Sequence, residues 1–275
     1  MKAWTYRILR AAFMAVIAWV LYQVLDHFDQ EWLFFPIVVG FFLLWVAEQG
    51  RRTWSRKKKE ADWDRWEASV ADPAARPNAI REVRAALAKS ERFGTRLRQE
   101  QAHLSVILAE LLDAGGRADE AVRVLAKVDL AALTPSQAVV VRHARVVAYL
   151  SANMLDDAEV ALKVRAQDSG EPDMDARLDL LDAMVAVERG DTARAAGIVK
   201  DVEERFRDDP YLAAECRVAR AVVDDAKGDR DGAVRALREL DATTLESLAQ
   251  LGPPRVRPLA AAASATSGEA QAGDR

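Results

Sequence analysis

Two long apolar runs near the start of the chain dominate its hydrophobic pattern. Residues 11–25, AAFMAVIAWVLYQVL, and residues 32–47, WLFFPIVVGFFLLWVA, contain no charged side chain. Each run is slightly short of the ~20 residues that a tilted membrane helix needs. The first extends back to Ile8 if Arg10 reaches the headgroups. Aromatic residues flank both runs, as they do at membrane interfaces. The pattern predicts a two-span transmembrane hairpin over residues 1–50.

Two other interpretations apply to these runs. The first run is similar to the apolar part of a signal peptide, but no A-x-A-like cleavage site precedes Asp26. A second apolar run also follows at once, which a cleaved signal does not explain. The other interpretation is a helical hairpin buried in a soluble core. Two spans account best for both runs.

The charges around the runs predict the orientation of the hairpin. Lys2, Arg7 and Arg10 precede the first run, whereas the loop 26–31 holds three acidic residues and no Lys or Arg. Six basic residues follow the second run in RRTWSRKKK: Arg51, Arg52, Arg56, Lys57, Lys58 and Lys59. By the positive-inside rule, both termini and everything after residue 50 are cytoplasmic. The residue bias favours a bacterium, and hence its inner (cytoplasmic) membrane.

The six basic residues are therefore expected at the membrane surface. Fixing the topology is their simplest role, and a regulated contact with anionic lipids is the alternative. Residues 51–78 form a juxtamembrane segment with a linker helix that ends at the breaker DPAARPN.

A second pattern repeats through residues 79–251. A Gly or Asn recurs at spacings of 37, 37 and 38, followed five residues later by an alanine and four further on by an aliphatic residue. The recurring positions are Gly116, Asn153, Gly190 and Gly228; Ala121, Ala158, Ala195 and Ala233; Leu125, Leu162, Val199 and Leu237. Prolines recur with nearly the same spacing at Pro135, Pro172 and Pro210. A fixed period of this length is typical of stacked supersecondary units.

Each recurring residue type has a physical role in a helical hairpin. Gly or Asn takes the left-handed conformation of the turn, the alanine lets two helices approach closely, and proline ends the second helix. The prediction is an all-α chain in which about four antiparallel helix pairs stack as a solenoid. Residues 76–91 and 245–251 are expected to be capping helices. The Pro-, Ala-, Gly- and Ser-rich tail 252–275 is expected to be disordered.

The repeat resembles the tetratricopeptide repeat (TPR) family over about residues 79–240. The shared features are the turn glycines, the alanine five residues later, and small residues in the first helix at Ala109, Ala183 and Ala221. The period is longer than the family's 34 residues, and the usual first-helix aromatic is present only as Tyr149. The resemblance implies a TPR-like α-solenoid that binds protein segments, and a generic helical-hairpin solenoid is the alternative.

Registering the repeats on the family pattern places one set of first-helix residues on the concave face. The candidates are His103, Val106, Glu110, Val140, His143, Val147, Leu150, Arg177, Leu180, Met184, Val218 and Val222. This groove is apolar in its middle and acidic at both ends. It is expected to bind a protein partner, either an amphipathic helix or an extended segment with basic flanks. Packing against neighbouring helices or the C-terminal helix is the alternative.

Charge and composition narrow the function further. Residues 1–59 hold nine of the 39 basic and four of the 43 acidic residues, so the rest of the chain is strongly acidic and unsuited to nucleic acid. With three histidines, one cysteine and neither a phosphate loop nor metal-ligand spacing, we expect no catalytic site, cofactor or metal. Cys216 is interpreted as a structural thiol.

These features favour a membrane-anchored scaffold that holds protein partners at the inner membrane. An accessory subunit held in a larger membrane complex through its spans is one alternative. The layout of two N-terminal spans followed by repeats also resembles the HemY-like proteins of tetrapyrrole metabolism, which is the other alternative.

Overall fold

The computed structural model describes residues 57–92, 98–163 and 170–272 of the chain. Both predicted spans, together with Arg51, Arg52 and Arg56, lie outside the described residues. In the part that is described, none of the helices combines the length and apolar character that crossing a bilayer requires. The chain divides into two compact units, Met1–Asp64 and Arg65–Arg275. The described residues 57–64 of the first unit are helical, and Lys57, Lys58 and Lys59 are exposed there.

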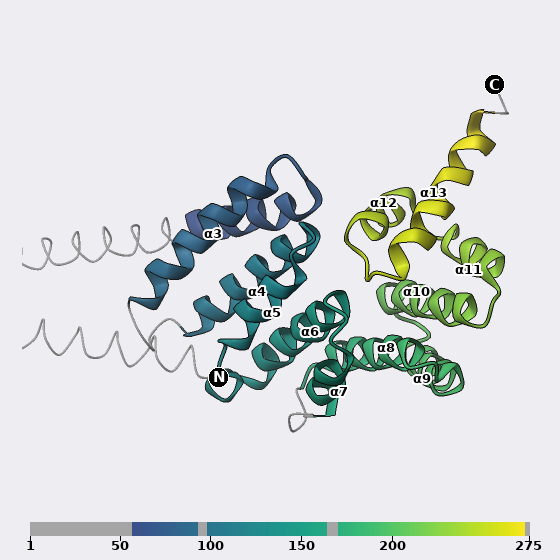
Figure 1. Cartoon of the computed structure of the whole chain (residues 1–275), viewed down its shortest axis with the longest axis horizontal. Coiled ribbons are helices and arrows are strands. Elements are labelled where there is room, and N and C mark those ends of the chain that lie inside the picture. Colours follow the sequence, from purple (N-terminus) through teal and green to yellow (C-terminus); the bar gives the residue numbers. More distant parts are fainter. Residues whose placement is uncertain (1–56, 93–97, 164–169, 273–275) are drawn as a thin grey trace, which may run out of the picture. The chain divides into compact units, whose positions relative to one another are not determined.

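The described residues confirm the predicted all-α class, since they contain helices and no strand. Helix α3 (Arg76–Glu91) directly precedes a series of helix pairs (Figure 1). The pairs are α4 (Arg98–Ala114) with α5 (Ala118–Ala126), α6 (Pro135–Ser151) with α7 (Leu155–Lys163), α8 (Pro172–Glu188) with α9 (Thr192–Arg205), and α10 (Pro210–Ala226) with α11 (Arg230–Leu237). A short 3-10 turn, η3 (Leu130–Ala132), lies between α5 and α6, and α12 (Ala242–Leu251) and α13 (Val256–Ala272) follow α11.

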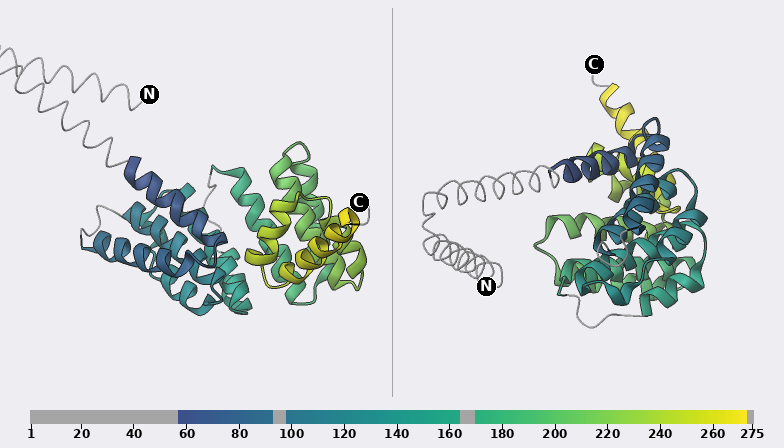
Figure 2. Two further views of the ribbon diagram at one scale, coloured as in Figure 1. Left: turned by 90° about the horizontal axis from the view of Figure 1, so that it is seen from above. Right: turned by 90° about the vertical axis from the view of Figure 1, so that its left-hand side faces the viewer.

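From α6 onward, each first helix packs against both helices of the preceding pair. Helix α4 contacts α6, α6 contacts α8, and α8 contacts α10, while each first helix also contacts its own second helix. In Figure 2 the yellow α12–α13 pair lies beside the green α10–α11 pair, in agreement with the contacts between α11 and α13. The core therefore runs from pair to pair, and its largest cluster joins α8 to α13.

Each pair turns at a residue with positive φ, as the repeat predicted. The φ angles are 73° at Gly116, 57° at Asn153, 82° at Gly190 and 93° at Gly228. At Gly190 the N–H donates to the Val187 carbonyl (2.9 Å), and the next N–H, of Asp191, donates to the Ala186 carbonyl (2.9 Å). The other three turns have the same two bonds. This Schellman arrangement satisfies the last carbonyls of the first helix and reverses the chain.

The predicted close-packing alanines are confirmed as well. Ala121, Ala158, Ala195 and Ala233 have no exposed surface. Each lies on the second helix of its pair, where a larger side chain would push the two helices apart. The aliphatic residues four positions later continue the buried stripe at Leu125, Val199 and Leu237, whereas Leu162 is half-buried.

The prolines have a different role from the one predicted. Pro135, Pro172 and Pro210 begin α6, α8 and α10, and α9 already ends at Arg205. A proline at the first helical position costs little, because the N–H that it lacks has no partner inside the helix. Thr134 completes the start of α6 through a capping box with Gln137. The prolines therefore mark the start of each pair and do not stop the preceding helix.

The two ends of the repeat array give one confirmed helix and one correction. Helix α3 covers the predicted residues 76–91, and Trp66, in the helix before it, is buried with its indole N–H donating to Glu82 (2.9 Å). The expected disorder from residue 252 is wrong for α13. Its buried residues Val256, Leu259, Ala260 and Ala263 follow the i, i+3, i+4, i+7 pattern of one helix face. The composition of the tail conceals this apolar stripe.

The turn geometry predicts opposite effects for one substitution at two glycines. Gly190→Ala forces a side chain into the left-handed region and should lower the free energy of unfolding by about 1 kcal/mol. Gly197→Ala, at an exposed position inside α9 with open space around it, should raise that free energy by about 1 kcal/mol. Denaturant midpoints of the full-length proteins measure both changes. Shifts in the same direction would contradict the proposed role of the turn.

Candidate functional site

One face of the first helices carries residues that recur at the repeat spacing. We call it the first-helix face, and its four levels run from the beginning to the end of each helix. The levels are His103, Val140, Arg177 and Glu215; Val106, His143, Leu180 and Val218; Glu110, Val147, Met184 and Val222; and Asp113, Leu150, Val187 and Asp225. Successive first helices contact one another, and the repeat spacing puts the residues of one level at equivalent positions along them.

The first level is the open end of this face. The exposed fraction is 41% for Val140 and 39%, 37% and 40% for the side chains of His103, Arg177 and Glu215. The Arg177 guanidinium lies 3.0 Å from a Glu215 carboxylate oxygen, so α8 and α10 are joined here. His103 Nε2 lies 3.8 Å from Glu67. An exposed valine thus shares its level with charged and polar side chains that are partly exposed.

The middle of the face is largely closed. Val106, Leu180, Val218 and Val222 are buried, His143, Val147 and Met184 are half-buried, and Glu110 is exposed. The buried members belong to the core because each first helix packs on its own second helix and on the neighbouring first helices at once. Several residues predicted to line a groove are therefore core residues. Helical spacing identifies the residues that share a level but not how deeply each is buried.

The fourth level is covered by the chain's own residues 252–257, which we call the C-terminal segment. Arg255 Nε lies 2.7 Å from Glu188 at the end of α8, and Arg255 Nη1 lies 3.9 Å from Asp225 on α10. Arg257 Nη2 lies 3.6 Å from Asp113 on α4. A cavity of about 230 Å³ lies between this segment and a set of residues from α6, α8 and α10: Leu150, Ser151, Met184, Glu188 and Val222. Packing of this face against the C-terminal helix is the alternative from the sequence, but the contact is made by residues that the sequence predicted to be disordered.

Burial shifts the titration of several groups on the face. It raises the pKa of Glu110 to about 7, and the nearby Glu67 carboxylate raises it further, although the Glu110 side chain still reaches the solvent. Burial also raises the pKa of Asp113, against the effects of the Ser151 hydroxyl and Arg257. The pKa of His143 falls to about 4 through burial and the nearby Arg177. Carboxylates in such surroundings are stabilised by an added positive charge.

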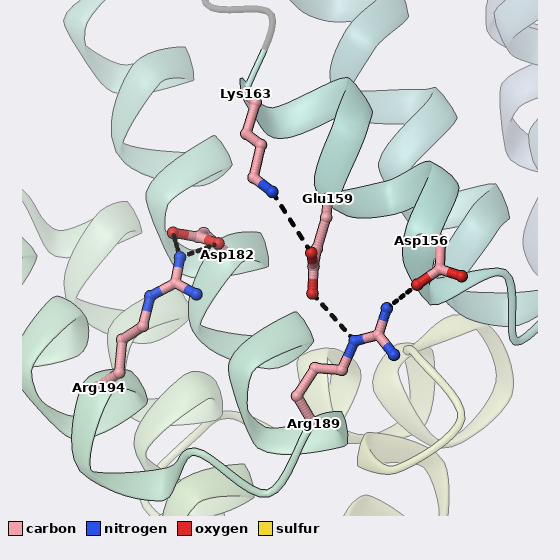
Figure 3. A network of polar contacts seen from close by, with 6 residues as sticks. All are labelled: Asp156, Glu159, Lys163, Asp182, Arg189 and Arg194. Carbon is pink, nitrogen blue, oxygen red and sulfur yellow. Dashed lines mark hydrogen bonds and ion pairs between the residues drawn. The ribbon is translucent and has the colours of Figure 1, made fainter.

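A second polar cluster joins residues of α7, α8 and α9 (Figure 3). Arg189, directly after α8, donates to Glu159 (2.9 Å) and to Asp156, both on α7. Arg194 donates twice to Asp182, at 2.8 and 2.6 Å. These pairs lie beside a cavity of about 470 Å³ that has charged residues from α6 to α9 on its walls. Because its acidic and basic groups largely pair with each other, the cluster joins two helix pairs and offers little net charge to a ligand.

Groups suited to covalent or metal chemistry are sparse in the described part of the chain. No set of three or more His, Cys, Asp or Glu side chains is placed there to hold a metal ion. Cys216 is buried in α10, and burial, together with Glu203 and Glu215, raises the pKa of its thiol to about 11. The thiol is therefore protonated at neutral pH and a poor nucleophile.

Comparison of the chain with protein-family models, curated proteins and solved structures found no match.

The raised pKa of Glu110 predicts a pH-dependent stability. The folded state holds the Glu110 proton more tightly than the unfolded state. The protonated carboxyl therefore contributes to the free energy of unfolding below pH 4.5, and this contribution is lost as the pH rises to about 7. Relative to the parent, Glu110→Gln should therefore raise the free energy of unfolding more at pH 8 than at pH 4. Denaturant midpoints at the two pH values measure the difference. Glu246→Gln, on an exposed part of α12, is the control and should shift both midpoints equally. An equal shift for Glu110→Gln would contradict the raised pKa.

Proposed function

We propose that this protein is a membrane-anchored scaffold whose helical repeats bind a protein partner. A two-span hairpin holds it in the bacterial inner membrane, and the repeat domain is a TPR-like α-solenoid in the cytoplasm. The observation that carries the proposal is the open end of the first-helix face. There, Val140 is exposed at the level of the partly exposed His103, Arg177 and Glu215, while most residues of the deeper levels are buried or half-buried.

The repeat supports the TPR-like part of the proposal. Four successive pairs within the described residues share a Schellman turn at a Gly or Asn and a fully buried alanine five residues later. Stacked pairs of this kind generate an extended surface from equivalent residues of successive repeats. A surface built in this way suits the recognition of a peptide segment or helix from another protein.

The membrane part of the proposal rests on the sequence alone. Each of the two uncharged runs is close to the length of a bilayer span, and the first extends back to Ile8. Basic residues precede the first run and follow the second, whereas the loop between them has none. Tethering the repeat domain at the membrane raises its local concentration relative to partners there, so a weak contact suffices.

The charges on the face indicate the chemistry of the partner. Glu110, Asp113 and Glu215 are carboxyl groups whose pKa burial raises, so a cation brought next to them is stabilising. Val140 offers an exposed apolar contact at the level of Glu215. A partner segment with an apolar centre and basic flanks satisfies both features.

Two exposed valines provide a matched test of this surface. Val140→Arg places a cation on the proposed contact, whereas Val160→Arg changes a 59% exposed valine on α7, outside the first-helix face. Desolvating the new arginine should weaken binding at least about tenfold, a loss of about 1.4 kcal/mol. The measurement is the amount of a defined protein that co-purifies with tagged full-length chain in mild detergent.

We expect Val160→Arg to retain the partner and Val140→Arg to lose it, with both variants unfolding at the same temperature as the parent. Retention by both variants would contradict the proposal. The contact would then lie in the spans or the basic segment, as in an accessory subunit of a membrane complex.

A further inference from the structure

The C-terminal segment, residues 252–257, reaches three helix pairs that are not its neighbours in sequence. Arg257 approaches Asp113 at the end of α4, and Arg255 contacts Glu188 and Asp225 on α8 and α10. Pro253, Pro254 and Val256 face a cavity that Leu150 of α6 also lines. The segment thus lies across the ends of all four first helices, at the fourth level of the first-helix face.

The chemistry of the segment is complementary to that level. Two arginines flank Val256, whose side chain is fully buried, and each arginine lies next to a carboxylate of the face. The level itself has acidic groups at its two ends, Asp113 and Asp225, with Leu150 and Val187 between them. Apolar contact in the middle and opposite charges on both sides are the features proposed above for a partner segment.

The local backbone holds the segment in a defined shape. A Cβ atom on Gly252 would lie 2.5 Å from the Leu248 carbonyl oxygen, so only glycine fits between α12 and the segment. Arg257 Nε donates to the Gly252 carbonyl (2.5 Å), and the Val256 N–H donates to the Pro253 carbonyl (2.8 Å). The segment is therefore presented to the first helices as a compact turn.

One contact in this arrangement is incomplete. Arg257 Nη2 is buried and has no hydrogen-bond partner among the described residues, since Asp113 is 3.6 Å away and itself accepts from Ser151 (3.1 Å). A buried donor without a partner costs free energy. A ligand that places its cation closer to Asp113 would remove this cost and has an advantage over the chain's own segment.

We propose that residues 252–257 are an intramolecular ligand of the first-helix face, and that the partner displaces them with a segment of the same chemistry, an apolar residue between two arginines. This inference rests on the proposed function and specifies its partner. A tethered segment competes at an effective concentration on the order of 1 mM. In the free protein, the segment then excludes basic ligands that bind weakly. Only a partner that binds more tightly displaces it.

The test uses a labelled synthetic peptide with the sequence of residues 252–263 and the full-length protein in detergent. Arg255→Glu with Arg257→Glu should release the segment, increase hydrogen exchange at the amides of residues 256–263, and let the peptide bind at least about tenfold more tightly than to the parent. Arg255→Glu alone, which changes the two ion pairs of a partly exposed arginine, should give a smaller change in the same direction and covers the case in which the double variant does not fold.

Matched controls separate specific displacement from general charge effects. Arg84→Glu breaks an ion pair with Glu120 (2.8 Å), which links α3 to α5 away from the segment, and should bind the peptide as weakly as the parent does. A peptide with both arginines replaced by glutamate should not bind any variant. Glu188→Arg added to Arg255→Glu should restore the protection of residues 256–263.

Equal peptide binding to the parent and the released variants, or no binding to either, overturns the inference. A second result would also overturn it: partner capture that depends on Val140 but does not change when the segment is released. Such a partner would use only the open end of the face. The proposed function survives both results, since it fails only if capture does not depend on Val140. Tighter peptide binding together with increased partner capture by the released variants supports the inference.

Discussion

The close approach of two helices at a buried alanine is the constraint on which the whole repeat domain depends. Ala121, Ala158, Ala195 and Ala233 have no exposed surface, and each lies five residues after a turn of fixed geometry. The turn sets the direction in which the second helix returns, and the alanine sets how near it comes. The turn and the alanine recur at nearly constant spacing. The two helices therefore have the same relative position in each pair.

This regularity brings equivalent first-helix residues to the same level. The level at the beginning of the helices remains accessible because little packs over Val140 and its neighbours, whereas the level at their ends is covered by the C-terminal segment. One face therefore has an open polar end and a closed end, although the residues of both ends were assigned by the same spacing. The difference comes from residues 252–257 and α13, which lie outside the repeat.

Local features were predictable from the sequence. The turns at Gly116, Asn153, Gly190 and Gly228, the alanines and helix 76–91 depend on backbone sterics and helical periodicity, which act over a few residues. The role of the prolines was misassigned because a proline fits both after one helix and at the start of the next. Of the candidate site, the members of each level were predictable, but their burial depends on neighbouring helices that the spacing does not describe. The C-terminal segment was missed because Asp113, Glu188 and Asp225 are far from it in sequence.

The contact between Arg257 and Asp113 has a further consequence for how the repeat domain unfolds. In a linear array each unit touches only its neighbours, so the ends can fray while the middle remains folded. Here a late segment of the chain is attached to α4 as well as to α8 and α10. Separating the first pair from the rest requires that this attachment break, and the same is true of the last pair. The segment therefore couples the unfolding of the first and last helix pairs.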